Sequence, residues 1–167
     1  MTIHMKILKP TLLALACALL LVSTHQITHK TIESNQRRYE ERVFREMVNG
    51  AALMKSISGY NVFLKGTEIG TIEQFMTTRG YNGQIDLLIA LTSDRKVMSV
   101  RVTHHKETPG IGDKIEQDVS NWIHQFAGKS ARDTDWILSP EGDIDAISGA
   151  TVTSRAVTSA IAEVLSE

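Results

Sequence analysis

A stretch of 14 uncharged residues near the N-terminus constrains this chain most, because a segment without charge belongs in a bilayer or a buried core. Residues 11–24 read TLLALACALLLVST. Extended to residues 7–27, the segment predicts a helix of about 30 Å, enough to cross a bilayer core. The strictly apolar part also suits the core of a signal peptide, but no small-x-small cleavage pattern follows Leu21. We therefore favour an uncleaved anchor over a cleaved leader.

The charges around this segment predict its orientation. Lys6 and Lys9 precede it, and the next lysine or arginine is Lys30. The positive-inside rule then predicts cytoplasmic residues 1–6, a single-pass helix over residues 7–27, and a C-terminal domain on the periplasmic, outer side of the inner membrane. Residues 28–50 interleave arginine with glutamate and predict a solvated juxtamembrane helix ending near Gly50.

Overall charge and cysteine content exclude some classes. The net charge is -1, so the chain lacks the basic excess that is typical of nucleic-acid binding, and no nucleic-acid partner is expected. Membrane lipid is the expected partner of the anchor. Cys17 is the single cysteine, so no disulfide can form within the chain, and its surroundings make a poor lipoprotein signal.

Alternating apolar residues predict an antiparallel hairpin in the second half of the chain. A turn-like tetrad, residues 93–96, separates two runs of alternating apolar side chains. Leu88 and Ala90 are apolar as well, so the first strand is expected to be covered on both faces. The members of the two runs are Ile85, Leu87, Ile89, Leu91 and then Met98, Val100, Val102.

Two helices are expected after the hairpin. The first is predicted over residues 113–126, with Asp113 and Glu116 forming a capping box and an apolar stripe ending at Phe126. The second runs from Val152 to Leu165, with one apolar face. Because strands and helices do not alternate regularly, the fold class expected for residues 51–167 is α+β, an antiparallel sheet flanked by helices.

The start of the last helix suits a phosphate. Residues 148–151 read Ser-Gly-Ala-Thr, and the first turn of a helix carries unpaired N–H groups and partial positive charge. Gly149 leaves room for a close ligand, while Thr151, Thr153 and Ser154 add hydroxyl groups. Serine and threonine also begin many ordinary helices as caps, so the residues alone leave both interpretations open.

The string SGATVTS, with Asp145 three residues before Ser148, resembles the flavinylation motif of FMN-binding domains. The strings GYNGQIDLLIAL and RVTHHKETPGIGDKIE and the segment around Trp122 are similar, in the same order, to the G subunit of the Rnf (Rsx) ion-translocating electron-transport complex. The resemblance covers about residues 80–167, and the N-terminal anchor fits it. The stretch between the anchor and Tyr81 is shorter than in the family, which puts some partner contacts in doubt.

This resemblance implies a covalent FMN. In the family, a flavin transferase moves FMN from FAD onto the last threonine of the motif, here Thr151, through a phosphoester. Ser148, Gly149, Ala150 and Thr153 would line the attachment site. The chain would be an electron-transfer subunit, not catalytic alone, working with other subunits of a redox-driven translocase. Three rivals stay open: the flavin subunit of a sodium-pumping NADH:quinone oxidoreductase, a stand-alone membrane flavoprotein, and an assembly module without cofactor.

The loop over residues 103–112 is the second candidate site. Pro109 and Gly110 would fix Glu107 and Thr108 beside the flavin. The alternative is a plain loop in which Glu107 pairs with Lys106 or Arg101 at the surface.

Metal binding and hydrolysis are disfavoured, and no metal is expected. His104 and His105 are adjacent in a strand and point to opposite faces, and His124 lacks a ligand partner at helical spacing. Ser148 lacks the G-x-S-x-G elbow of a hydrolase nucleophile.

Overall fold

The computed structural model describes residues 14–25, 28–29, 35, 38, 42–44, 46–48, 51–55 and 59–166. The chain divides into two compact units, Met1–Arg42 and Val43–Glu167. In the first unit, residues 14–25 are helical. Among the residues described, no helix combines the length and the hydropathy needed to span a bilayer. The rest of the predicted span, residues 7–13 and 26–27, and most of the predicted juxtamembrane helix lie outside the described residues.

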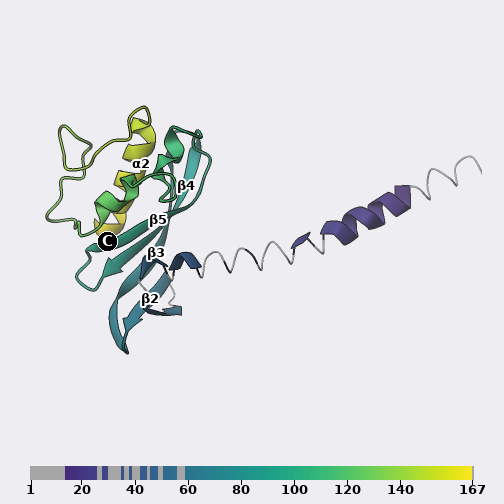
Figure 1. Ribbon diagram of the computed structural model, residues 1–167, viewed down its shortest axis with the longest axis horizontal. Helices are drawn as coiled ribbons and strands as arrows, with labels where there is room; N and C mark the ends of the chain where they lie inside the picture. The colour runs from purple at the N-terminus through teal and green to yellow at the C-terminus, as the bar shows by residue number, and fades with distance from the viewer. Residues whose placement is uncertain are drawn as a thin grey trace, which may run out of the picture. The chain divides into compact units, whose positions relative to one another are not determined.

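The second unit is built on a five-stranded antiparallel meander, in which each strand pairs with its neighbour in sequence (Figure 1). The predicted hairpin is confirmed as β4 and β5, with Ile89 opposite Val100. Glycines 59, 66, 70, 80 and 83 lie in or beside β2, β3 and β4. The strands are β1 (Ala52–Lys55), β2 (Gly59–Leu64), β3 (Thr67–Gly80), β4 (Gly83–Thr92) and β5 (Val97–His105).

Strand β4 is covered on both faces, as its sequence predicts. On one face, Leu87 and Ile89 pack into a core with the buried side of helix α2 (Thr151–Ser166). On the other face, Leu88 and Ala90 pack with apolar residues of β2, β3 and the segment just before β1. That segment contributes Val43, Phe44, Met47, Val48 and Ala51. The α+β class is therefore confirmed for this unit.

The prediction of one helix over residues 113–126 is wrong. Two short 3-10 segments stand in its place, η1 (Gly112–Ile115) and η2 (Trp122–Phe126). The chain turns to extended backbone at Glu116, and Ser120 replaces helical hydrogen bonds by accepting from the N–H of Trp122 and donating to the carbonyl of Lys114. The predicted capping box is also absent from this described segment, since the cap position is Ile111 and has no side-chain cap bond.

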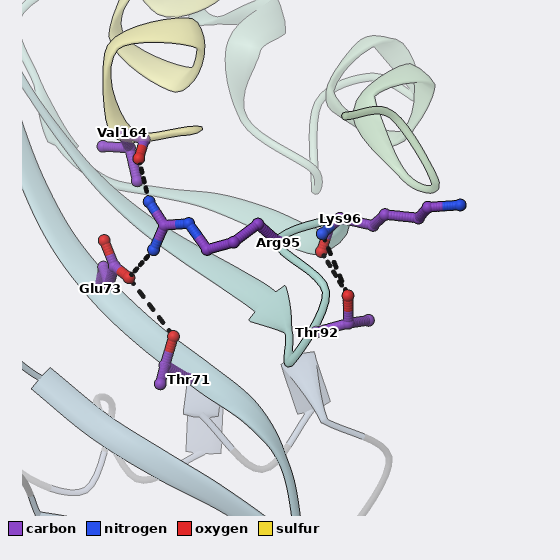
Figure 2. A network of polar contacts seen from close by, with 6 residues as sticks. All are labelled: Thr71, Glu73, Thr92, Arg95, Lys96 and Val164. Atoms are coloured by element: carbon purple, nitrogen blue, oxygen red, sulfur yellow. Dashed lines mark hydrogen bonds and ion pairs between the residues drawn. The ribbon is translucent and has the colours of Figure 1, made fainter. Parts of the chain in front are cut away.

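The C-terminal end of α2 is tied to the sheet by the β4–β5 turn (Figure 2). Arg95 has a φ of 59° in that turn. Its guanidinium donates to Glu73 Oε1 of β3 at 2.7 Å and to the carbonyl of Val164 near the end of α2. In the same turn, the Thr92 hydroxyl donates to Asp94 and holds the pKa of that carboxyl below its usual value. The turn thus sets where the helix lies across the sheet.

Candidate functional site

A pocket of about 520 Å³ lies at the N-terminal end of α2. Three segments far apart in sequence form its walls: the β3–β4 turn, the loop after β5, and the start of α2. The volume falls in the range of about 300 to 1,000 Å³ that is common for small-molecule sites. Its lining residues are Tyr81, Glu107, Thr108, Ile111, Gly112, Gly149, Ala150, Thr151, Val152 and Thr153.

Hydrogen bonds, including those of the buried Ser154 hydroxyl, fix the conformation of the turn that leads into α2. The N–H of Ala150 donates to the carbonyl of Ile147 at 2.9 Å, and Gly149 has a φ of 80°, which favours glycine. Ser154 is fully buried, and its hydroxyl accepts from the N–H of Ile147 at 2.9 Å and donates to the carbonyl of Ala150 at 3.0 Å. Thr151 stays exposed as the first residue of α2. The turn therefore leaves Thr151 exposed at the pocket.

The backbone just before this turn is anchored on η2. The carbonyl of Asp145 accepts from the indole N–H of Trp122 at 2.6 Å and from the amide of Gln125 at 3.3 Å. The N–H of Asp145 in turn donates to Gln125 Oε1 at 2.8 Å. The short segment η2 thus fixes the place from which the Ser-Gly-Ala-Thr turn starts.

Glu107 joins two walls of the pocket. Its side chain is only 4% exposed; Oε1 accepts the N–H of Asn82 at 2.9 Å and Oε2 accepts the hydroxyl of Thr153 at 2.5 Å. Such donors are needed because a buried carboxylate without them is costly. Two glycines make room for it. A Cβ on Gly80 would lie 2.7 Å from Glu107 Oε1, and a Cβ on Gly112 would lie 2.8 Å from Glu107 Cβ.

The loop that carries Glu107 is closed on itself. The carbonyl of Thr108 accepts the N–H groups of Ile111 and Gly112, at 3.1 and 2.9 Å. Gly110, with a φ of 77°, donates its N–H to Asp113 Oδ2 at 2.8 Å. The hydroxyl of Thr108 accepts from the side-chain amide of Asn82 at 3.3 Å. The first three bonds close the loop, and the bond between Thr108 and Asn82 holds it against the β3–β4 turn.

Six of the seven residues singled out in the sequence lie together in this pocket: Glu107, Thr108, Gly149, Ala150, Thr151 and Thr153. The seventh, Ser148, is exposed and is not among the lining residues. The hydroxyl of Thr153 is directed to Glu107. The alternative in which Glu107 pairs at the surface is wrong, because the side chain is buried.

Sequence reasoning did not single out the apolar rim of the pocket. Tyr81, Ile111 and Val152 are 70%, 45% and 46% exposed, an unusual exposure for three apolar side chains that line one pocket. Asn82, which bonds both Glu107 and Thr108, was also missed. The signal available in the sequence is the aromatic residue within the Gly-Tyr-Asn-Gly turn.

The histidines have separate surroundings. His105 contacts Glu116, with 2.5 Å between Nε2 and Oε1, whereas His104 is exposed. Within the described ranges, no group of three His, Cys, Asp or Glu side chains is placed to hold a metal ion.

These features suit a flavin phosphate. An exposed threonine stands on the first turn of a helix, where a phosphate is favoured, and the adjoining pocket combines hydrogen-bonding groups with an apolar rim. The model for the FMN-binding domain matches residues 80–166, which is more than half of the chain.

Known relatives extend this match. The chain is 33% identical over 174 residues to the G subunit of the ion-translocating oxidoreductase complex of Stutzerimonas stutzeri, covering 92% of this chain and 76% of that protein. It is 48% identical over 86 residues to the G subunit of Photorhabdus laumondii, and 42% identical over 110 residues to that of Pseudomonas aeruginosa. The chain therefore belongs to the FMN-binding domain family and, within it, to the G subunits of ion-translocating oxidoreductase complexes.

The extent of the match differs between relatives. Residues matched to the Photorhabdus protein make up 49% of this chain and 41% of that one; for Pseudomonas the shares are 64% and 51%. The chain thus spans about half or less of the length of these relatives. Among solved structures, the C subunit of the Na⁺-translocating NADH-quinone reductase of Parabacteroides distasonis has a TM-score of 0.52 at 24% identity, covering 64% of this chain and 58% of that one. That likeness concerns the fold.

Proposed function

We propose that this chain carries FMN on Thr151 as a phosphoester and relays electrons as the G subunit of an ion-translocating oxidoreductase complex. The observation that carries the proposal is the placement of Thr151: an exposed threonine on the first turn of α2, at the edge of a pocket with an apolar rim. The names of the relatives support the assignment to this complex, and the family description supports FMN as the cofactor.

Attachment requires a free hydroxyl and a place for the phosphate. In the proposed transfer, the Thr151 oxygen forms a bond to the flavin-side phosphorus of FAD, the pyrophosphate P–O bond breaks, AMP leaves, and the hydroxyl proton passes to solvent. A separate flavin transferase would catalyse this step. The N–H groups of the first turn of α2 then face the phosphate and favour its negative charge.

The remaining pocket residues would hold the rest of the cofactor. The exposed apolar surfaces of Tyr81, Ile111 and Val152 suit the flat dimethylbenzene part of the isoalloxazine ring, which is apolar. Thr108 offers a hydroxyl to the ribityl chain or the ring. Bound flavin supplies one- and two-electron redox chemistry, and the protein supplies its orientation.

We also propose that residues 7–27 anchor the chain and that the domain lies on the outer side of the inner membrane. The uncharged stretch and the two lysines before it support this topology. Lipid and the other subunits of the complex would then be its partners. A flavin subunit of a sodium-pumping quinone reductase is the nearest rival, since that fold is shared.

Thr151→Ala tests the attachment site. We expect loss of all covalent flavin from a domain that still folds, because Thr151 is exposed and its side chain contributes little to the core. The full chain would be produced together with a flavin transferase, and the readouts are intact mass and flavin fluorescence on a denaturing gel.

Thr158→Val is the matched control. Thr158 lies two turns further along α2, is 1% exposed, and its hydroxyl has no hydrogen-bond partner within the described part of the chain. This variant should keep its flavin. A Thr151→Ala band that still fluoresces would refute the site, and a parent protein without FMN mass would favour the assembly module. Subunits recovered with the parent in mild detergent distinguish the two complexes.

A further inference from the structure

His105 stands at the base of the loop that forms one wall of the pocket. It is the last residue of β5, and its side chain is 9% exposed. The ring Nδ1 accepts the backbone N–H of Glu107 at 3.0 Å. The ring Nε2 lies 2.5 Å from Oε1 of Glu116, just beyond η1. The imidazole therefore bridges the two ends of the loop.

The two contacts select one tautomer of the ring. A backbone N–H can only donate, so Nδ1 must be the unprotonated, accepting nitrogen. A neutral imidazole then carries its proton on Nε2, where it donates to the Glu116 carboxylate. A different tautomer would set two donors against each other at Glu107.

The bond to His105 is one of three that fix Glu107. Its backbone N–H is held by His105, and its two carboxylate oxygens by Asn82 and Thr153. Glu107 and Thr108 both line the pocket, whereas His105 is not among the lining residues. Any effect of His105 on a bound flavin must therefore pass through the loop.

We propose that His105 is a positioning residue: by accepting the N–H of Glu107 at Nδ1, it fixes the loop wall of the flavin pocket and thereby sets the redox equilibrium of the bound flavin. This inference rests on the proposed function, since it requires FMN at Thr151.

Three substitutions at His105 divide its roles. His105→Leu removes both contacts. His105→Asn places an acceptor oxygen near the position of Nδ1 and retains the bond to Glu107, whereas His105→Gln places its amide near Nε2 and retains only the contact with Glu116. His104→Leu is the matched control, because His104 is the adjacent histidine of the same strand and is exposed.

The experiment uses the full chain, flavinylated during production, and measures the visible absorption bands and the reduction equilibrium of the covalent FMN. For His105→Leu and His105→Gln we expect shifted bands and a change of up to about fivefold in the reduction equilibrium constant, the size of one hydrogen bond from the displaced loop to a single redox state of the flavin. His105→Asn and His104→Leu should match the parent.

Several outcomes would overturn the inference. One is a flavinylated His105→Leu protein with the bands and equilibrium of the parent; another is an equal shift in His104→Leu. If His105→Leu does not fold, the other two substitutions decide: a parental His105→Gln protein, or a shifted His105→Asn protein, contradicts the role of Nδ1. A parent that carries no FMN removes the proposed function itself, and the intact mass reports this separately.

Discussion

Glu107 shows how much one buried residue can organise. Its carboxylate lies between two glycines that leave it room and two donors that come from different walls of the pocket. A negative charge held beside a flavin disfavours the addition of electrons, because reduction places further negative charge nearby. The same side chain therefore has a structural role and, in the proposed function, an electrostatic one.

Glu107→Gln separates these two roles. The amide oxygen can accept from Asn82 and the amide nitrogen can donate to Thr153, whose hydroxyl accepts as readily as it donates. We expect the free energy of unfolding to fall by less than about 1 kcal/mol, while the flavin midpoint potential rises by a few tens of millivolts. Urea denaturation and a redox titration measure the two effects.

Glu107→Ala supplies the contrast. The substitution leaves the N–H of Asn82 and the hydroxyl of Thr153 without their acceptor and creates a void. The free energy of unfolding should therefore fall by about 2 to 3 kcal/mol. An unchanged midpoint potential in Glu107→Gln would mean that the carboxylate does not lie close enough to the flavin to influence it.

At the scale of elements, the sequence predicts the segments whose apolar residues recur at regular spacing. It fails where side-chain hydrogen bonds compete with those of a regular helix. The β4–β5 hairpin and α2 follow from regular apolar spacing, and the structure confirms both. The segment over residues 113–126 has helical spacing too, yet Ser120 bonds its backbone and the carboxylate of Glu116 contacts His105 instead of capping a helix. Ile115 and Phe126 still reach the core through two single-turn segments.

The pocket residues also fall into two groups, those that the sequence predicts and those that it does not. The turn motif and the Glu107–Thr108 loop are continuous strings with recognisable chemistry, and the structure brings them together. Tyr81, Ile111 and Val152 come from three separate segments, and only the folded chain shows that they share one exposed rim. The spacing of residues along a sequence does not show that side chains from separate segments lie side by side in the fold.

Arg95→Ala tests the tie between the β4–β5 turn and the end of α2. The substitution removes a charged donor from the carbonyl of Val164 and from Glu73, so we expect the free energy of unfolding to fall by about 1 to 2 kcal/mol. Thermal and urea unfolding of the parent and the variant measure the difference.

Arg79→Ala is the control for this experiment. Its partner Glu163 also lies on α2, but the side chains are 62% and 46% exposed, and such surface pairs contribute little. Equal losses in the two variants would show that the carbonyl contact of Arg95 adds nothing beyond a surface ion pair.

At the scale of the whole molecule, the proposed function makes the N-terminal stretch the part that places the flavin on one side of the membrane. If residues 7–27 anchor the chain as proposed, alkaline phosphatase fused after Glu167 should be active, because that enzyme functions only outside the cytoplasm. A reporter that works only in the cytoplasm should be silent at the same position. The reverse pattern would contradict the orientation, and a mature chain that begins near Thr24 would replace the anchor with a cleaved leader.

The meander has a consequence for the order in which the domain is assembled. Each strand pairs with its neighbour in sequence, and β3 and β4 are separated by only two residues. Docking α2 on β3 instead closes a loop of roughly seventy residues, at about 2 to 3 kcal/mol more in closure entropy than a tight hairpin. Thr151, the acceptor in the proposed function, therefore lies on an element whose docking costs more closure entropy than the pairing of adjacent strands. Since the pocket also needs the β3–β4 turn and the loop after β5, a chain in which the pocket is complete has already formed β3, β4 and β5.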